Sequence, residues 1–590
     1  MSIDIETYRL KAQEAIEYVF VKEYHNSLGI PMPIVKMLLP DDANYSTGQY
    51  YITIDKTWQI HLNFGKLPIS YHEFQNEVKV LTRHEIEHYM CCPFDVITHF
   101  RMLKRIRDVY YKHFSHLGIN IEYACGAISN QAADIIVDTK NYYRHSKETL
   151  KSEIDWIKIG ANISACPRHC KLMFLTKEAI WKEDLGINET DPEFLKIVHQ
   201  LADSFTKNGI EDKSSFLDKV EEYAEIFFKL YVEDQKNPQQ SSQQGSQQQS
   251  GQQGSQQQSG QQGPQQQSGQ QGSQQQSGQQ GSQQQSGQWG VGRPKDGDEH
   301  GNAFVFADPD KVKEAIEVLA EETSVEEFID LLAIAGIIGM SDKQKGVLWF
   351  NVQSANIIPI VEFSNTGNKS SYTYPSVWRI GDPIEELDLM LTYMTSPRLI
   401  PGMTTKKWEY VSNDDNGTES KQMDLLLVVD TSGSMGSAMK ESANMHQAVL
   451  ASYGILSYFE STKSKVAFIG FSDKIDAYVD WSDKYDDVRE RLLTNGHGGT
   501  KFPISRIKST LDVRSRDLVT VLITDGDLGN INESVSYFRD YLNDDNKLYI
   551  FLLGGSKSLH SYEPLKNIGA KIYNANNANE FCDMVLTDME

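Results

Sequence analysis

The stretch DLLLVVDTSGS, Asp424 to Ser434, decides the fold of the C-terminal part of the chain. Five apolar residues are followed by small polar ones, which is typical of a buried strand that ends in a tight turn. Apolar runs of similar length follow at 465–471, 518–525 and 547–554, and a helix is expected from Met435 to about Phe459. Apolar strands that alternate with helical stretches indicate a parallel sheet covered on both faces, so the sequence predicts a Rossmann-like α/β domain.

The turn after this strand carries oxygen-bearing side chains. Asp430, Ser432 and Ser434 stand at alternate positions at the carboxyl end of the strand, which is the edge of a doubly wound sheet where ligands bind. Two later loops supply matching groups, Thr500 in GHGGT and Asp525 in ITDG. Hydroxyl and carboxylate oxygens are hard ligands that suit Mg²⁺. The sequence therefore predicts a magnesium site made by these five residues.

This pattern resembles the complete metal-ion-dependent adhesion site (MIDAS) of von Willebrand factor A (VWA) domains, over about residues 420–590. The resemblance implies that Ser432, Ser434 and Thr500 bind Mg²⁺ directly, with Thr500 sometimes acting through a water molecule. It implies that Asp430 and Asp525 act mainly through water molecules and hydrogen bonds to the serines. The remaining coordination position would accept a carboxylate from a partner protein, so a Mg²⁺-dependent protein-binding domain is expected.

A second motif, HEIEH, begins at His84, inside a helix expected between Ser70 and Pro93. Residues four apart share one face of a helix, so His84 and His88 can bind one zinc ion. Glu85 stands beside them in the position of a general base. The motif therefore predicts a catalytic zinc site in the N-terminal part.

A catalytic zinc site needs a third protein ligand, and the stretch NQAADIIVD offers candidates. Asn130, Asp134 and Asp138 lie four apart on one face of a helix expected over Ser129–Arg144. Asp134 is the chosen third ligand and Asp138 the partner that orients a ligating histidine, with the reverse assignment open. The competing ligands are His99, His113, His116 and Glu122.

HEIEH and the NQAAD helix together resemble zinc peptidases of the gluzincin and aspzincin type. They are more similar to the metallopeptidase-like domains that occur beside VWA domains in bacteria and archaea. The resemblance covers about residues 70–145 and implies zinc-dependent hydrolysis of a peptide or protein. A further cluster, Cys166, His169 and Cys170 in CPRHC, lacks a second Cys/His pair, and no metal is assigned to it.

Composition divides the chain into a mainly helical, zincin-like α+β domain at 1–235, a linker at 236–290, an α+β segment at 291–420 and the VWA domain at 421–590. The linker repeats GSQQQSGQQ, a unit without apolar side chains that would offset the entropy of ordering it, so a disordered tether is expected. The segment at 291–420 is expected to pack on the VWA domain and cover an edge of its sheet.

Local patterns predict further elements. Ser70 with Glu73 and Ser324 with Glu327 have the spacing of capping boxes, which open helices. The remaining expected elements are a β-hairpin at 50–65, two helices within 309–335 and an amphipathic helix at 382–396.

The charge balance excludes one class of function. Lys and Arg number 57 against 81 Asp and Glu, a net charge of −24, whereas binding to the phosphate backbone of nucleic acids needs a basic face. The N-terminal residues show no secretory pattern, and the longest apolar run, 331–340, is too short to span a bilayer. A cytoplasmic protein without membrane or nucleic-acid partners is expected.

Two functions remain from the sequence. The preferred one is a zinc metallopeptidase-like protein whose VWA domain binds a partner through Mg²⁺. Proteins with this combination are similar to components of systems built around MoxR-type AAA+ ATPases, which implies such an ATPase as the partner. The alternative is a non-catalytic adaptor of an AAA+ ATPase, of the chelatase or cofactor-insertion type. A cell-surface adhesin is disfavoured because no export signal is visible.

Overall fold

The chain divides into two compact units, and the predicted linker beyond residue 236 lies outside the described residues. Unit 1 comprises Met1–Ile316 and Ala333–Gly336, and unit 2 comprises Glu317–Leu332 and Ile337–Glu590. The computed structural model describes residues 5–25, 28, 32–38, 50–54, 59–64, 70–159, 163–236, 309–337, 340–355, 372–377, 406–410, 423–514, 517–526, 528–544, 546–554 and 559–575.

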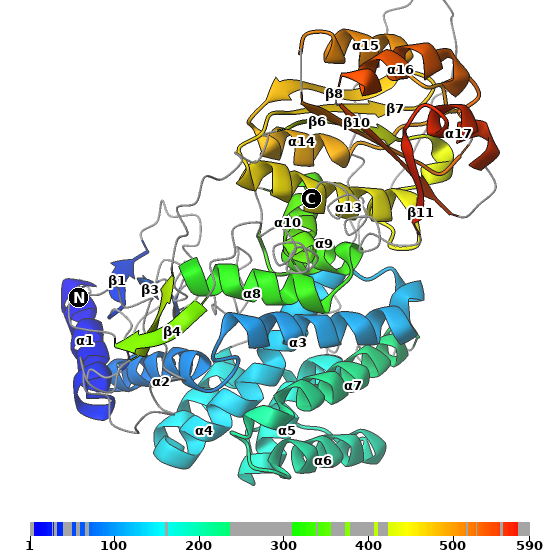
Figure 1. Cartoon of the computed structure of the whole chain (residues 1–590). Coiled ribbons are helices and arrows are strands. Elements are labelled where there is room, and N and C mark those ends of the chain that lie inside the picture. The colour runs from blue at the N-terminus through cyan, green and yellow to red at the C-terminus, as the bar shows by residue number, and fades with distance from the viewer. Residues whose placement is uncertain are drawn as a thin grey trace, which may run out of the picture. The chain divides into compact units, whose positions relative to one another are not determined.

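Unit 1 is mainly helical, with one small sheet (Figure 1). The strands lie in the order β1-β3-β2, and the predicted hairpin is confirmed because β2 pairs antiparallel with β3. Strand β1, parallel to β3, was not predicted. The elements are α1 (Ile5–Tyr18), η1 (Val19–Glu23), β1 (Ile34–Met37), β2 (Tyr50–Ile54), β3 (Gln59–Phe64), α2 (Tyr71–Met90), α3 (Val96–Val109), α4 (Ile121–Ile159), α5 (Arg168–Trp181), α6 (Pro192–Thr206) and α7 (Phe216–Lys236).

Helix α2 carries the HEIEH motif and begins where the sequence predicts. The Glu73 amide donates to Ser70 Oγ at 3.3 Å and the Ser70 amide to Glu73 Oε2 at 3.2 Å, so the capping box is formed. Phe74, Val78 and Ile86 are buried in a core with α1 and the small sheet. This burial positions the opposite side of α2, with the histidines, toward α4.

Helix α4 corrects the expected Ser129–Arg144 helix, because it spans Ile121–Ile159 with one non-helical residue, His145 (φ −136°, ψ 49°). Between Ile121 and Ile159, the sequence contains no Pro, and no Gly after residue 126, that would end the helix. Both halves are tied to α2: Arg144 pairs with Glu87 before the kink, and Glu148 pairs with Arg83 after it. Tertiary contacts therefore extend the helix beyond its predicted end.

Glu87, the second glutamate of HEIEH, is fully buried in a charged network. Its carboxylate pairs with Lys140 Nζ at 2.8 Å and Arg144 Nη1 at 2.9 Å, and it accepts from the Tyr24 hydroxyl at 2.9 Å. Removing one partner of a buried ion pair leaves the other charge uncompensated. Glu87 therefore holds α2 against α4 and does not belong to the metal-binding face.

We expect Glu87→Gln to lower the free energy of unfolding of unit 1 by about 3 kcal/mol, the lower end of the cost of breaking a buried pair, because Arg144 stays half-exposed. The control is Glu211→Gln, which removes the other partner of Lys140, a 52% exposed side chain at 3.2 Å. That change should cost under about 0.5 kcal/mol. Urea unfolding followed by circular dichroism measures both, and equal losses would contradict the burial argument.

Unit 2 contains a six-stranded sheet in the order β11-β10-β9-β6-β7-β8 (Figure 1). Helices α15, α16 and α17 cover one face, and α13 and α14 cover the other. The elements of unit 2 are α8 (Pro309–Glu322, which begins in unit 1), α9 (Val325–Ile334), α10 (Asp342–Ala355), β4 (Tyr372–Val377), β5 (Lys406–Tyr410), β6 (Asp424–Asp430), η7 (Gly433–Met435), α13 (Asn444–Ser461), β7 (Val466–Phe471), β8 (Ile475–Ser482), α14 (Tyr485–Leu492), α15 (Ile504–Leu511), β9 (Leu518–Thr524), α16 (Val535–Asn543), β10 (Lys547–Leu553), α17 (Leu559–Lys566) and β11 (Lys571–Ala575).

The four predicted strands are confirmed as β6, β7, β9 and β10, each within one residue of its predicted bounds. The predicted all-parallel sheet is wrong at one edge, because β8 pairs antiparallel with β7. A three-residue turn, 472–474, joins these two strands and leaves no room for a crossover helix. Strand β8 alternates polar and apolar residues and is only partly buried, as an antiparallel edge strand allows.

The helix predicted from Met435 is wrong at its start, because α13 begins at Asn444. Gly436 has φ +75° and ψ −154°, a conformation outside the helical region, and an added Cβ there would lie 2.9 Å from the Cβ of Ala443. The chain thus leaves the turn after η7 and returns to begin α13 beside it. The loop places Asn444 near the predicted magnesium ligands.

The segment at 291–420 contributes α8, α9, α10 and a two-stranded antiparallel sheet, β4-β5. The Ser324–Glu327 capping box is formed, with contacts of 3.2 and 3.3 Å. Helix α10 was not predicted, and it packs on α13 and α14, helices that cover a face of the large sheet, rather than on an edge strand. The helix expected at 382–396 lies outside the described residues. No helix among the described residues has both the length and the apolar composition needed to cross a membrane.

Candidate functional site

Three predicted ligands of unit 1 converge on one point. His84 and His88 stand one turn apart on α2, and Asp134 faces them from α4. The two Nε2 atoms lie 3.1 Å apart, and Asp134 Oδ1 lies 3.5 Å from His84 Nε2 and 3.2 Å from His88 Nε2. Among the described residues, these three form the one group of three or more His, Cys, Asp or Glu side chains that could hold a metal ion.

The spacing of the three atoms fits a tetrahedral metal ion. Zinc binds His N and carboxylate O at about 2.0–2.2 Å, and two ligands of a tetrahedron are separated by about 1.6 times that length, roughly 3.3–3.6 Å. The observed edges of 3.1, 3.2 and 3.5 Å are close to this value. The two imidazole nitrogens and the carboxylate oxygen can therefore occupy one face of a tetrahedron with little movement.

Both imidazole rings are oriented by partners on their other nitrogen. His84 Nδ1 lies 2.7 Å from Asp138 Oδ1, and His88 Nδ1 lies 2.9 Å from the Cys92 carbonyl oxygen. Because these partners accept hydrogen bonds, the Nδ1 atoms carry protons, so a metal ion would be bound through the Nε2 atoms, which face Asp134. This tautomer is inferred from the contacts, and it is the one that metal binding requires.

The structure separates the two aspartates that the sequence left interchangeable. Asp134 lies at the Nε2 atoms, and its Oδ2 accepts from Asn130 Nδ2 at 3.0 Å. Asp138 lies at Nδ1 of His84, one turn further along α4. Of the competing ligands, His99 is buried on α3, and His113, His116 and Glu122 are exposed; none joins the group.

Glu85 is half-buried, and its charge lies close enough to His84 to raise the pKa of that imidazole. No hydrogen bond or ion pair joins Glu85 to another residue in the described part of the chain. Its carboxylate is therefore not committed to a structural contact, unlike that of Glu87.

Sequence reasoning missed two members of the site, Lys177 and Glu153. Lys177 Nζ, from α5, lies 2.9 Å from Asp138 Oδ2 and also pairs with Glu153, which follows the kink of α4. Burial by itself would raise the pKa of Asp138, but Lys177 and His84 lower it. Burial by itself would lower the pKa of the His84 imidazole, but the charges of Asp138 and Asp134 raise it to about 9. No local motif marks Lys177, since it stands in an ordinary amphipathic helix.

The CPRHC cluster has a structural arrangement. His169 Nδ1 lies 2.8 Å from Asp234 Oδ2, and Arg168 donates to Asp234 Oδ1 at 2.9 Å, which ties α5 to the end of α7. Cys166 and Cys170 are not disulfide-bonded, and burial raises the pKa of Cys170 to about 12. Neither cysteine belongs to a group of three or more potential metal ligands in the described part of the chain.

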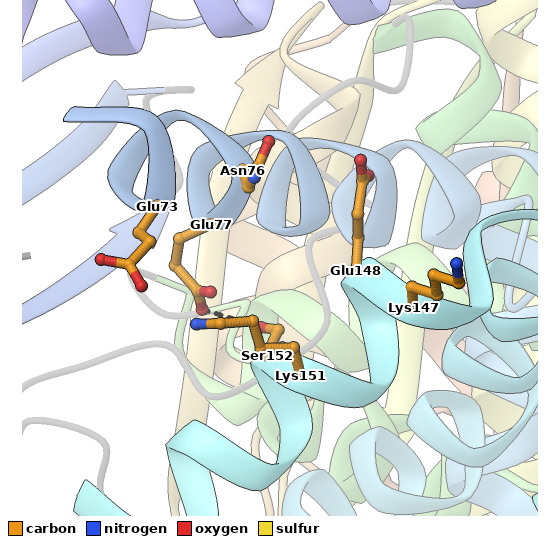
Figure 2. Close-up of a pocket in the computed structure, with 7 residues that line it drawn as sticks. All are labelled: Glu73, Asn76, Glu77, Lys147, Glu148, Lys151 and Ser152. Carbon is orange, nitrogen blue, oxygen red and sulfur yellow. Dashed lines mark hydrogen bonds between the residues drawn. The ribbon is translucent and has the colours of Figure 1, made fainter. Parts of the chain in front are cut away.

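A pocket of about 220 Å³ lies between α2 and the second half of α4 (Figure 2). At its wall, Glu77 accepts from Ser152 Oγ at 2.7 Å and from Trp156 Nε1 at 2.9 Å, and burial raises the pKa of Glu77. Neither the HEIEH histidines nor Asp134 line it. The lining residues are Glu73, Asn76, Glu77, Lys147, Glu148, Lys151 and Ser152.

In unit 2, the predicted magnesium ligands meet where β6 and β9 end. These neighbours are the first and fourth strands of the sheet in chain order, so the order reverses between them, and a doubly wound sheet binds ligands at such a point. Asp430 is fully buried, and its carboxylate accepts from the Ser432 amide at 2.9 Å and from Thr524 Oγ at 2.6 Å. The buried carboxylate of Asp430 thus holds the turn through hydrogen bonds, and burial raises the pKa of Asp430.

The rest of this site consists of hydroxyl and carboxylate groups. Ser432 Oγ lies 3.1 Å from Ser434 Oγ, which donates to Asp525 Oδ1 at 3.0 Å. Asn444, at the start of α13, donates to Asp525 Oδ2 at 3.1 Å. Ser434 is exposed and Asp525 is half-exposed, so a ligand from solvent can reach them. Asn444 was not predicted, because the expected helix ran through this position.

The loop that carries Thr500 lies against the DTSGS turn. The Gly433 amide donates to the Gly498 carbonyl at 3.3 Å, and a Cβ at Gly496 would lie 2.6 Å from the Thr431 carbonyl oxygen, so glycine is needed for this approach. Thr500 is half-exposed, and its side chain makes no hydrogen bond to the other four predicted ligands in the described structure. The structure thus links four of the five residues directly or through one neighbour and brings the Thr500 loop alongside.

No family model matches the chain, and no curated protein matches it. One solved structure, titled an uncharacterized membrane spanning protein from Vibrio fischeri, is 18% identical over 28% of this chain and 96% of that chain, with a TM-score of 0.13. A likeness this weak carries no argument about fold or function.

Proposed function

We propose that unit 1 is a zinc metallopeptidase-like domain and that unit 2 contains a VWA domain that binds a protein partner through Mg²⁺. The observation that carries the proposal is the meeting of His84 Nε2, His88 Nε2 and Asp134 Oδ1 within 3.5 Å of one another. The donor set of two imidazoles and one carboxylate is that of a catalytic zinc site, which leaves one position for a substrate or water.

The residues of unit 1 have distinct roles in this proposal. The zinc ion would be held by His84, His88 and Asp134. It would act as a Lewis acid that polarises a scissile carbonyl. Glu85, held beside His84 on the same helix, accepts a proton from the attacking water and delivers it to the leaving amine. Asp138 and the Cys92 carbonyl hold the imidazoles in the required tautomer. The substrate class is a peptide or an unfolded protein.

For unit 2, the support is the cluster of Ser432, Ser434 and Asp525 at the switch point of the sheet, in which Ser434 is exposed and Asp525 half-exposed. A Mg²⁺ ion there would be the largest local positive charge on a chain of net charge −24, so it would recruit a carboxylate of the partner. By the family resemblance, the partner is a MoxR-type AAA+ ATPase.

The test of the catalytic role is Glu85→Gln, measured as cleavage of an unfolded casein substrate by the zinc-loaded full chain. Loss of the general base should lower kcat about 10²–10⁴-fold. Zinc content should stay at the wild-type value, because Glu85 is not among the three converging ligands. Full activity in Glu85→Gln would contradict the peptidase role. A wild-type chain that binds zinc, cleaves nothing and still binds the ATPase would favour the adaptor alternative.

A further inference from the structure

A buried chain of charges extends from the candidate metal centre into the protein. It runs from His84 Nδ1 to Asp138 Oδ1 at 2.7 Å, from Asp138 Oδ2 to Lys177 Nζ at 2.9 Å, and from Lys177 to Glu153. The side chains are 12%, 13%, 2% and 13% exposed in that order, so solvent screens these charges little. Lys177 is the cation that joins the two carboxylates.

The position of Lys177 makes it the counter-charge of the centre. Asp134, Asp138 and Glu153 each act electrostatically on Lys177, and its ammonium group lies 2.9 Å from Asp138 Oδ2. A buried carboxylate that loses its partner pays the full cost of desolvation. Asp138 without Lys177 would therefore no longer be held as an oriented acceptor for His84 Nδ1–H.

The packing of α5 on α4 does not depend on this ion pair. Trp181 stacks on Tyr142 with ring centroids 4.7 Å apart and an interplanar angle of 4°, and its Nε1 donates to Thr139 Oγ at 3.0 Å. Leu172 and Leu175 of α5 are buried as well. These contacts hold the two helices together, so the ammonium group of Lys177 is directed to the charges of the site.

We propose that Lys177 is a positioning residue for the metal centre: its ammonium group fixes Asp138, and Asp138 in turn presents His84 Nε2 to the metal ion. The inference rests on the proposed zinc site of unit 1. Removal of a residue that orients a metal ligand typically lowers metal affinity 10–100-fold. Glu153 balances the charge of Lys177 and does not itself touch a metal ligand, so its role is confined to stability.

The experiment compares five full-length variants: Lys177→Met, Glu153→Gln, the double variant of these two, Asp138→Asn, and Asp138→Asn combined with Lys177→Met. Zinc affinity is measured by competition with a chromophoric chelator in excess Mg²⁺, which occupies the site of unit 2. The d–d absorption of bound Co²⁺ reports the ligand geometry. Thermal unfolding of the metal-free proteins reports stability separately.

We expect Lys177→Met to lower zinc affinity about 10–100-fold and to change the Co²⁺ spectrum. Glu153→Gln should leave zinc affinity within about threefold of wild type, well below the loss expected for Lys177→Met. The double variant removes both charges of the pair, so its metal-free stability should return toward wild type while its zinc affinity stays low. On the Asp138→Asn background, Lys177→Met should cost no further affinity, because it acts through Asp138.

Wild-type zinc affinity in the double variant, or full additivity of Lys177→Met with Asp138→Asn, would overturn the positioning role and leave Lys177 as a structural ion pair. A wild-type chain that binds neither Zn²⁺ nor Co²⁺ would overturn the proposed metal centre and this inference together. The double variant keeps the test decisive if Lys177→Met alone fails to fold.

Discussion

Asp134→Ala is expected to lower the zinc affinity of the full chain by more than about 100-fold, beyond the 10–100-fold typical of residues that only orient ligands. Asp134 Oδ1 lies 3.2 Å from His88 Nε2 and 3.5 Å from His84 Nε2, so its loss removes the carboxylate of the donor set. Two imidazoles on one helix remain, one ligand short of a protein-bound catalytic zinc.

The effect on stability follows from mass action. A ligand at 100 times its Kd stabilises the folded state by about 2.7 kcal/mol, and the same concentration stabilises a 100-fold weaker variant by only about 0.4 kcal/mol. Zinc should thus raise the unfolding temperature of the wild-type chain and barely affect Asp134→Ala. Calorimetric scans with zinc and with a chelator measure the difference.

The matched control for this prediction is Asp203→Ala, which removes an exposed aspartate of helix α6. It loses the same charge on a helix that carries none of the three converging residues, so its zinc affinity should equal that of the wild type. Equal affinity in Asp134→Ala and Asp203→Ala would show that Asp134 is not a ligand, and Asp138 would then be the next candidate to test.

Ser432→Ala combined with Ser434→Ala is expected to abolish Mg²⁺-dependent binding of the partner to unit 2. The two hydroxyls lie 3.1 Å apart, and their removal takes away two hard oxygen ligands without changing net charge. The affinity for Mn²⁺, a paramagnetic substitute for Mg²⁺, should fall on the order of 100-fold, as for lost metal partners generally. Electron paramagnetic resonance measures it on the zinc-loaded chain.

The control pair is Ser461→Ala with Ser509→Ala, exposed serines whose hydroxyls donate to backbone carbonyls of their own helices. Binding of a MoxR-type ATPase is compared for wild type in Mg²⁺, wild type in EDTA, the site variant and the control pair. We expect binding to be lost for wild type in EDTA and for the site variant. Binding should be retained for wild type in Mg²⁺ and for the control pair. Equal binding in all four would rule out docking through the metal site.

Local patterns predicted the elements whose periodicity is complete within a few residues. The strands β6, β7, β9 and β10 are near-continuous apolar runs, and burial on both faces of a sheet requires that composition. The capping box at Ser70 and Glu73 was predictable for the same reason, because both hydrogen bonds lie within one turn. The pairing of His84 and His88 follows from the helical repeat itself.

Elements whose stability comes from distant residues were not predicted. Strand β8 is half-exposed and becomes a strand by pairing with β7, and α10 is a helix whose Trp349 and Phe350 rings pack on His446 of α13. The long extension of α4 depends on ion pairs with α2. In each case the deciding contact joins segments that the local pattern treats separately.

The sequence by itself identified the donor groups of both candidate sites, because residue type and helical or strand spacing decide which atoms can share a face. It could not decide between Asp134 and Asp138, which occupy the same face of one helix. The packing of α4 against α2 decided it, by placing Asp134 at the Nε2 atoms and Asp138 at Nδ1 of His84. Only the tertiary structure brought in Lys177, 39 residues from Asp138, since a buried carboxylate needs a cation and any helix that packs there can supply it.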